Sequence, residues 1–129
     1  YALFTNDTGG IRDDLMVANR GDHLLLVVNA ACKEADEAHL HAHLSAACEI
    51  ERLDRALIAL QGPQAEAALA RLAPACTAMN FMDVAALDIL SVSCIVARSG
   101  YTGEDGFEIS IPPDHVQDIA AALLTDPSV

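Results

Sequence analysis

The chain has 129 residues, of which 53% are hydrophobic and 20% are charged, and this is enough material for one compact domain with its own core. Seven Lys and Arg residues against nineteen Asp and Glu residues give a formal net charge of −12. This balance excludes a general nucleic-acid binder, which needs a basic face, and argues against docking on an anionic membrane. The last cation is Arg98, so an anionic ligand bound by residues 99–129 would be repelled.

Hydrophobic periodicity and turn residues predict strands that alternate with helices. The predicted strands cover residues 1–5, 11–18, 23–28, 49–53, 56–60, 86–90, 94–98 and 107–111. The predicted helices cover residues 33–48, 63–72 and 114–124. Because tight turns join most of the strands, we expect an α+β fold with an antiparallel sheet and flanking helices on one face.

Two adjacent acids stand inside the apolar strand at residues 11–18. Alternation places Asp13 on one face with Leu15, and Asp14 on the other face with Met16. A carboxylate in such a setting is paired, hydrogen-bonded or functional. One reading is that the acids cap a turn or pair with a cation such as Arg12, and the other is that one of them is functional.

A glycine-rich loop at residues 99–106 leads into the strand at 107–111. The loop has no Lys and carries acids, so it does not suit a phosphate group. Glu108 follows on the strand face opposite Phe107. The pattern allows Glu108 to point into water, or to accept two parallel N–H bonds from a pterin or guanine edge.

The predicted helix at residues 33–48 carries three histidines. His39 and His43 share a face at i, i+4 spacing, with Asp36 one turn earlier, which is a possible metal site. The alternative, which we favour, is a solvated face beside a buried stripe of Leu40 and Leu44.

The four cysteines show no CxxC spacing, so neither a zinc ribbon nor a redox dithiol is indicated. They are expected to be reduced thiols, which favours a cytoplasmic location. The longest apolar stretch, Leu24–Val28, is too short to span a bilayer, and no GxSxG motif suggests a hydrolase.

Four segments, read in order, carry a family resemblance. They are TNDTGGIRDDLMV (5–17), LLVVNAACKEAD (25–36), ALIALQGPQAE (56–66) and RSGYTGEDGFEISIP (98–112). Together they resemble the aminomethyltransferases, or T-proteins, of the glycine cleavage system, over essentially the whole chain but only a middle portion of a family member. The resemblance implies that residues 1–129 are a single folate-binding domain fragment, ferredoxin-like in character, of a larger protein.

The same resemblance implies an activity. Such an enzyme takes the aminomethyl group from the lipoyl arm of the H-protein, releases ammonia and transfers the methylene to tetrahydrofolate. Its expected partners are therefore H-protein and tetrahydrofolate, with no metal, nucleic acid or membrane. Two alternatives are the folate domain of a sarcosine or dimethylglycine dehydrogenase, and a T-protein-like protein of iron–sulfur cluster maintenance.

The resemblance also implies roles for single residues. Asp14 matches the family carboxylate near the folate nitrogens and is the expected catalytic residue, while Glu108 matches the glutamate that holds the pterin. The remaining matches are three folate-contacting residues and one arginine expected to brace the glycine-rich loop: Tyr101, Asn29, Tyr1 and Arg98. The cationic groups that bind the anionic folate tail in the family have no match in the chain.

Overall fold

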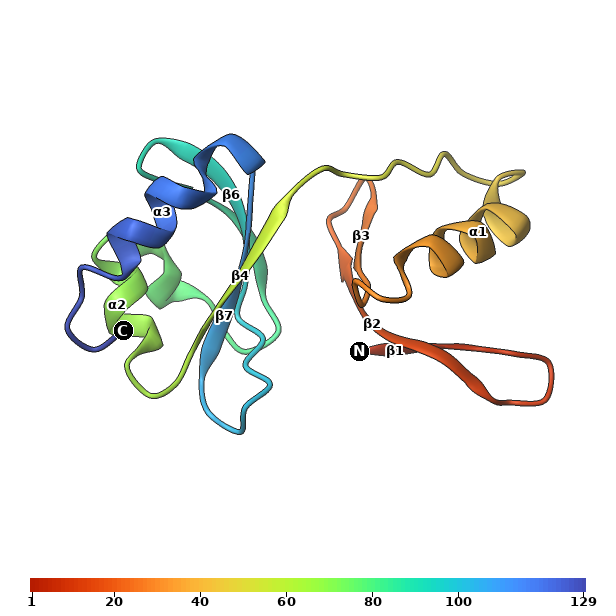
Figure 1. Cartoon of the computed structure of the whole chain (residues 1–129), viewed down its shortest axis with the longest axis horizontal. Helices are drawn as coiled ribbons and strands as arrows, with labels where there is room; N and C mark the ends of the chain where they lie inside the picture. The colour runs from red at the N-terminus through yellow and green to blue at the C-terminus, as the bar shows by residue number, and fades with distance from the viewer. The chain divides into compact units, whose positions relative to one another are not determined.

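The computed structural model describes all residues from 1 to 129, and the chain forms two compact units, residues 1–52 and residues 53–129. Each unit has its own antiparallel sheet, so the α+β class with antiparallel strands is confirmed (Figure 1). The difference from expectation is that the strands divide between two sheets.

The first unit is a three-stranded meander with one helix. Its strands are β1 (Ala2–Thr5), β2 (Ile11–Asn19) and β3 (Leu24–Val27), in the sheet order β1-β2-β3, and its helix is α1 (Lys33–Leu44). The predicted strands are therefore confirmed almost to the residue. Within β2, Asp13 and Leu15 are buried while Asp14 is exposed, as strand alternation predicts.

The turn between β1 and β2 is built by Asn6. Its side-chain oxygen accepts hydrogen bonds from the backbone N–H of Thr8 (3.0 Å) and of Gly10 (2.8 Å). Gly9 has a φ of 82°, which a residue with a Cβ adopts only with strain. This local chemistry sets the register that pairs Phe4 with Asp13.

Helix α1 differs from its prediction in length and in which side chain it buries. It ends at Leu44 instead of residue 48, and Leu44 itself is exposed. The one buried residue of the helix is Asp36, with 3% of its surface exposed. The expected Leu40 and Leu44 stripe is therefore wrong, and a carboxyl group occupies the innermost position of that face.

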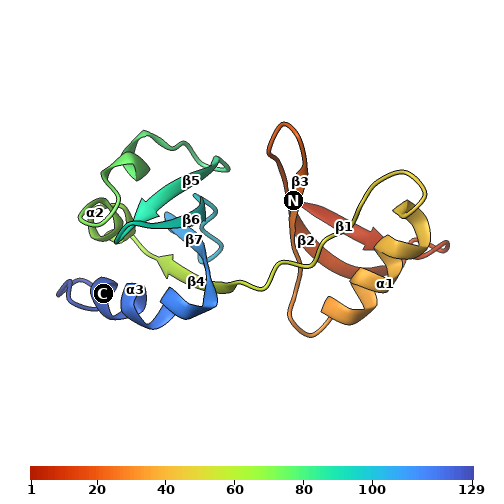
Figure 2. The ribbon, with the colours of Figure 1, turned by 90° about the horizontal axis from the view of Figure 1, so that it is seen from above.

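The second unit contains a four-stranded sheet in the order β4-β7-β6-β5. The strands are β4 (Ala56–Gln61), β5 (Val84–Ile89), β6 (Val92–Ala97) and β7 (Gly106–Ile111). The helices are α2 (Ala65–Ala70) and α3 (Val116–Leu123), with the short 3₁₀ helices η1 (Pro74–Ala78) and η2 (Pro113–His115). Both α-helices lie on the same side of this sheet (Figure 2).

The hydrophobic core of the chain lies between that sheet and its helices. The inward residues of β7 are fully buried, as their alternation predicts: Phe107, Ile109 and Ile111. They pack in one cluster with Leu69 of α2 and Ile119 of α3. Because one face of the sheet is covered in this way, the opposite face is the one that presents Glu108.

One predicted strand is absent and two others are displaced along the chain. Residues 49–53 do not form a strand, because they connect the two units and no partner strand pairs with them. The β5–β6 hairpin turns through Leu90 and Ser91, both with positive φ (52° and 64°), although neither is a usual turn residue there. The sequence pattern therefore placed both strands about two residues late.

Candidate functional site

The carboxylate of Asp14 projects from the exposed face of β2 and is held at both oxygens. The hydroxyl of Tyr1 donates to Oδ2 at 2.9 Å, and the side-chain amide of Asn29 donates to Oδ1 at 3.1 Å. The hydrogen bond to the carboxylate raises the pKa of Tyr1, since ionising the phenol would remove that bond. Asp14 thus has a defined orientation while remaining open to a ligand.

Asn29 is in turn fixed by Asp13, which is only 6% exposed. The backbone N–H of Asn29 donates to Oδ2 of Asp13 at 3.1 Å, and its side-chain amide donates to Oδ1 at 2.9 Å. These bonds favour the ionised form and lower the pKa of Asp13 to about 2. The same amide also donates to the backbone carbonyl of Asp14 at 3.0 Å. Asn29 therefore links the two adjacent acids.

Asp36 is the fourth member of the group formed by Asp13, Asp14 and Asn29. The sequence analysis considered it only for the possible metal site. Burial and the neighbouring Asp13 carboxylate raise its pKa, and its Oδ2 atom is buried without a hydrogen-bond partner. Its spacing relative to Leu40 and Leu44 did not reveal this burial, because Leu44 on the same helix face is exposed.

Glu108 lies on the open face of the second unit's sheet, with Ala59 and Ala97 as its cross-strand neighbours. These neighbours carry only methyl side chains, and Glu108 is half-buried. The hydroxyl of Ser99, which is buried, donates to Oε2 of Glu108 at 2.6 Å. The Oε1 atom has no such partner, so the carboxylate retains acceptor capacity for a fork of two N–H groups.

Arg98 anchors the glycine-rich loop through its guanidinium group. Its Nε and Nη2 atoms donate to the two oxygens of Asp105 at 3.0 and 2.5 Å, and Nη1 donates to the carbonyl of Met79 at 2.8 Å. Glu66 lies 2.6 Å from Nη2, and the guanidinium stacks 5.3 Å from the Phe107 ring centroid. The paired guanidinium keeps the pKa of Asp105 below its ordinary value.

Tyr101 stands on the same loop with 68% of its surface exposed. Its backbone N–H donates to the side chain of Gln61 at 3.3 Å. Gly100 is required for the closeness of this loop, because a Cβ at that position would overlap the carbonyl oxygen of Glu104. The loop therefore presents an aromatic side chain on a backbone of defined shape.

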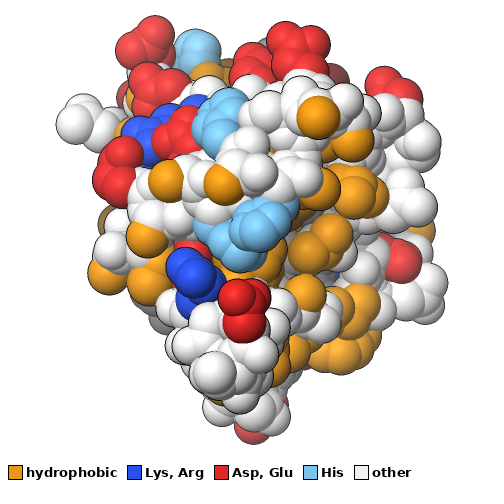
Figure 3. Space-filling model, turned by 90° about the vertical axis from the view of Figure 1, so that its right-hand side faces the viewer, with side chains coloured by type: hydrophobic (Ala, Val, Ile, Leu, Met, Phe, Trp, Pro, Cys, Tyr) orange, Lys and Arg blue, Asp and Glu red, His pale blue; other side chains and the backbone are white.

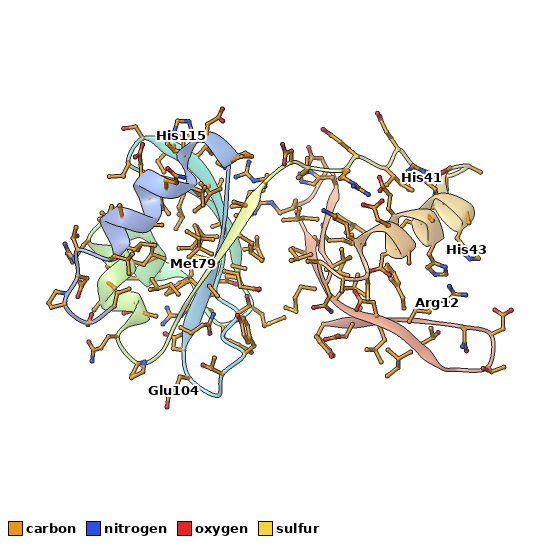
Figure 4. The ribbon with its side chains drawn as sticks, viewed as in Figure 1. Arg12, His41, His43, Met79, Glu104 and His115 are labelled. Atoms are coloured by element: carbon orange, nitrogen blue, oxygen red, sulfur yellow. The ribbon has the colours of Figure 1, made fainter.

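The histidines form a separate cluster. The rings of His39 and His43 are 4.5 Å apart, and Phe4 packs against His39 at 5.3 Å. Burial, His43 and Arg12 together lower the pKa of His39. Histidine side chains gather on the face seen in Figure 3, and Figure 4 shows Arg12 reaching toward the helix that carries His43. No group of three or more His, Cys, Asp or Glu side chains is arranged to hold a metal ion.

The structure therefore brings three of the predicted site residues into one network in the first unit: Tyr1, Asp14 and Asn29. The other three lie in the second unit: Glu108, Tyr101 and Arg98. The sequence prediction did not name Ser99 and considered Asp36 only for a metal site. Ser99 contacts Glu108, and Asp36 acts on Asp13, the direct neighbour of Asp14. None of the helices is long and apolar enough to cross a bilayer.

Comparison with known proteins connects these features to a family. The model of the GCVT N-terminal domain matches residues 1–128. The chain is 44% identical to the probable mitochondrial aminomethyltransferase of Schizosaccharomyces pombe, over 99% of this chain and 35% of that protein. It is 43% identical to the human mitochondrial aminomethyltransferase, over 99% of this chain and 34% of that protein.

A solved structure shows similarity to the same group of proteins. The crystal structure of the glycine cleavage system aminomethyltransferase T from Bartonella henselae is 37% identical, with a TM-score of 0.83, over 96% of this chain and 34% of that chain. The chain thus spans about a third of the length of the relatives it matches. Its match over residues 1–128 shows that it belongs to the GCVT N-terminal domain family, the family of the aminomethyltransferase T-proteins.

Proposed function

We propose that this chain is the folate-binding part of a glycine-cleavage aminomethyltransferase. The whole protein would move a methylene group from the aminomethyl-lipoyl arm of H-protein to tetrahydrofolate and release ammonia. The observation that carries the proposal is the Asp14 carboxylate, exposed on β2 yet fixed by Tyr1 and Asn29. A charge held in one orientation is what positioning and proton movement at a reacting amine need.

The proposal assigns each predicted residue one task. Asp14 orients the folate and supports charge or proton movement at its reacting nitrogens. Asn29 and Tyr1 hold Asp14 and contact folate. Glu108 accepts the ring N–H and exocyclic amine of the pterin, for which its Oε1 atom and the second lone pair of Oε2 are suited.

The remaining two residues act on the glycine-rich loop. Tyr101 offers a ring for packing against the ligand, and Arg98 is a structural support for the loop that carries it. We take residues 1–129 as one folate-binding domain fragment, ferredoxin-like in character, because the family model runs across both units. We propose no metal in this chemistry, since folate itself carries the one-carbon unit.

The compartment is part of the proposal. The reduced cysteines agree with a cytoplasmic protein, and all four are free in the structure. The relatives reported above from Schizosaccharomyces pombe and human are named mitochondrial. Imaging of the full-length protein with a fluorescent tag decides between the two compartments.

The decisive experiment is Asp14→Asn in the full-length protein. We expect turnover with aminomethyl-loaded H-protein and tetrahydrofolate to fall about 100-fold or more, because the charge at the reacting nitrogens is lost while the side-chain shape is kept. The matched control is Asp7→Asn, which removes an exposed acid from the β1–β2 turn. Circular dichroism should show the same fold for both variants. Near-normal turnover in Asp14→Asn would remove this residue from the catalytic role.

A further inference from the structure

A buried pair of carboxyl groups lies behind Asn29. Asp13 is 6% exposed and Asp36 is 3% exposed, and they face each other from β2 and α1. The titratable groups around the pair are Asp14 on β2 and the thiol of Cys32, the residue before α1, whose pKa is raised by the neighbouring Asp13 carboxylate. Asp13 is thus the charged group that acts on Asp36, and Asp36 is not neutralised by an ion pair.

The hydrogen bonds favour the ionised form at Asp13 and not at Asp36. Both oxygens of Asp13 accept N–H bonds from Asn29, as a carboxylate does. The Oδ2 atom of Asp36 is buried and receives no hydrogen bond. Two adjacent buried carboxylates would repel each other without compensation, and an acceptor without a donor adds a desolvation cost. A single proton on Asp36 removes both penalties, because the acid can then donate to Asp13.

We propose that Asp36 and Asp13 share one proton as a carboxylic acid–carboxylate pair, and that Asp36 is a positioning residue for Asp14. Asp36 acts on Asp14 through a chain of three contacts: Asp36 contacts Asp13, Asp13 binds Asn29, and Asn29 binds Asp14. The Asn29 amide has two N–H bonds for three acceptors, so one hydrogen is divided between the carbonyl and the carboxylate of Asp14. The orientation of Asn29 therefore depends on an ionised, correctly placed Asp13.

The direction of the pKa shifts agrees with this arrangement. Burial and the Asp13 charge raise the pKa of Asp36, while the donors around Asp13 lower its pKa. The folded protein therefore takes up the proton on Asp36 at a higher pH than the unfolded chain does. Stability from this residue is fully present below the ordinary Asp pKa of about 4 and is lost as the pH rises through the raised value.

The first test observes the proton and does not depend on the proposed function. Carbon-13 NMR of the side-chain carboxyl groups of the unmodified full-length protein should show Asp36 titrating above the ordinary Asp range and Asp13 below it. Denaturation at several pH values should show the wild type gaining stability over Asp36→Asn as the pH is lowered through the raised pKa of Asp36 toward the ordinary Asp pKa of about 4. An Asp36 carboxyl that titrates in the ordinary range, or lower, would overturn the shared proton.

The second test concerns positioning and rests on the proposed aminomethyltransferase function. Asp36→Asn keeps a neutral N–H donor toward Asp13, so kcat should stay within about twofold of the wild type. Asp36→Leu removes the donor, so kcat should fall about tenfold or more while the KM for tetrahydrofolate changes little. Glu34→Gln is the control, since Glu34 is an exposed acid in the same helical turn, paired with Arg52.

The outcomes separate this inference from the proposed function. Equal kcat in Asp36→Asn and Asp36→Leu would overturn the positioning role even where Asp14→Asn abolishes turnover. If Asp14→Asn kept full turnover, the proposed function of Asp14 would fail, and the NMR titration would still decide whether the proton is shared. If Asp36→Leu does not fold, the contrast between Asp36→Ser, which keeps an O–H donor, and Asp36→Ala, which removes it, takes its place with the same expectation.

Discussion

Glu108 and Asp14 are both carboxylates on strands, but their surroundings give them different chemistry. Asp14 has a donor on each oxygen, from Tyr1 and Asn29, which fits its proposed role as a fixed charge. Glu108 has a donor, Ser99, on one oxygen only. Acceptor capacity therefore remains on Glu108, and under the proposed function folate binding is the property that this residue should control.

Replacing Glu108 by Ala should mainly weaken folate binding. Each charge-assisted hydrogen bond shielded from water contributes about 1.5–3 kcal/mol, so the loss of one such bond corresponds to a weakening of about tenfold to 100-fold. Isothermal titration calorimetry of the full-length protein with tetrahydrofolate measures this change. Glu104→Ala is the matched control, because Glu104 is an exposed acid of the neighbouring loop (Figure 4). Unchanged affinity in Glu108→Ala would refute the pterin assignment.

Arg98 supports the fold of the second unit through four contacts, and its side chain is only 16% exposed. Arg98→Ala should lower the free energy of unfolding by about 2 kcal/mol, because it leaves Asp105 without its charged partner. Urea denaturation measures the loss. Arg71→Ala is the control, since its pair with Asp126 involves an arginine that is 48% exposed and should contribute less than about 1 kcal/mol. Equal losses in the two variants would show that Arg98 is an ordinary surface cation.

At the scale of elements, the strands were largely predictable and the connections were not. Alternation correctly separated Asp13 from Asp14 on β2 and Phe107 from Glu108 on β7, because successive side chains of a strand point to opposite faces of the sheet. The burial of Asp36 was not predictable, since a carboxyl group on an apolar helix face is explained only by the proton or partner that it finds in the folded protein. The strand expected at residues 49–53 failed because pairing depends on a neighbour that a local pattern does not reveal.

The β5–β6 hairpin offers a prediction at this scale. Leu90 and Ser91 both have positive φ, the geometry that Asn-Gly adopts with less strain. Replacing the pair by Asn-Gly should raise the free energy of unfolding by about 1 kcal/mol, and Leu90 loses little burial because it is 50% exposed. Thermal or urea denaturation of the second unit reports the gain. A less stable double variant would mean that Leu90 makes contacts that outweigh the backbone strain.

For the whole molecule, the distribution of buried residues differs sharply between the two units. Residues 1–52 bury three side chains, Asp13, Leu15 and Asp36. Residues 53–129 contain the hydrophobic core built on β7. The first unit therefore depends on hydrogen bonds around its acids for much of its local order, and these acids include the proposed catalytic group.

Charge is the other property of the whole molecule, and it leads to a prediction for these 129 residues expressed alone. Their net charge is −12, and folate carries an anionic glutamate tail, so repulsion should oppose binding. We expect affinity for tetrahydrofolate to be weaker than micromolar and to improve when salt is raised from about 0.01 to 0.15 M, because the Debye length falls from about 30 to 8 Å. Calorimetric titration at both ionic strengths measures the change, with the full-length protein as the reference. Submicromolar affinity, or binding that weakens as salt is added, would show that these residues bind the tail without help from cations elsewhere.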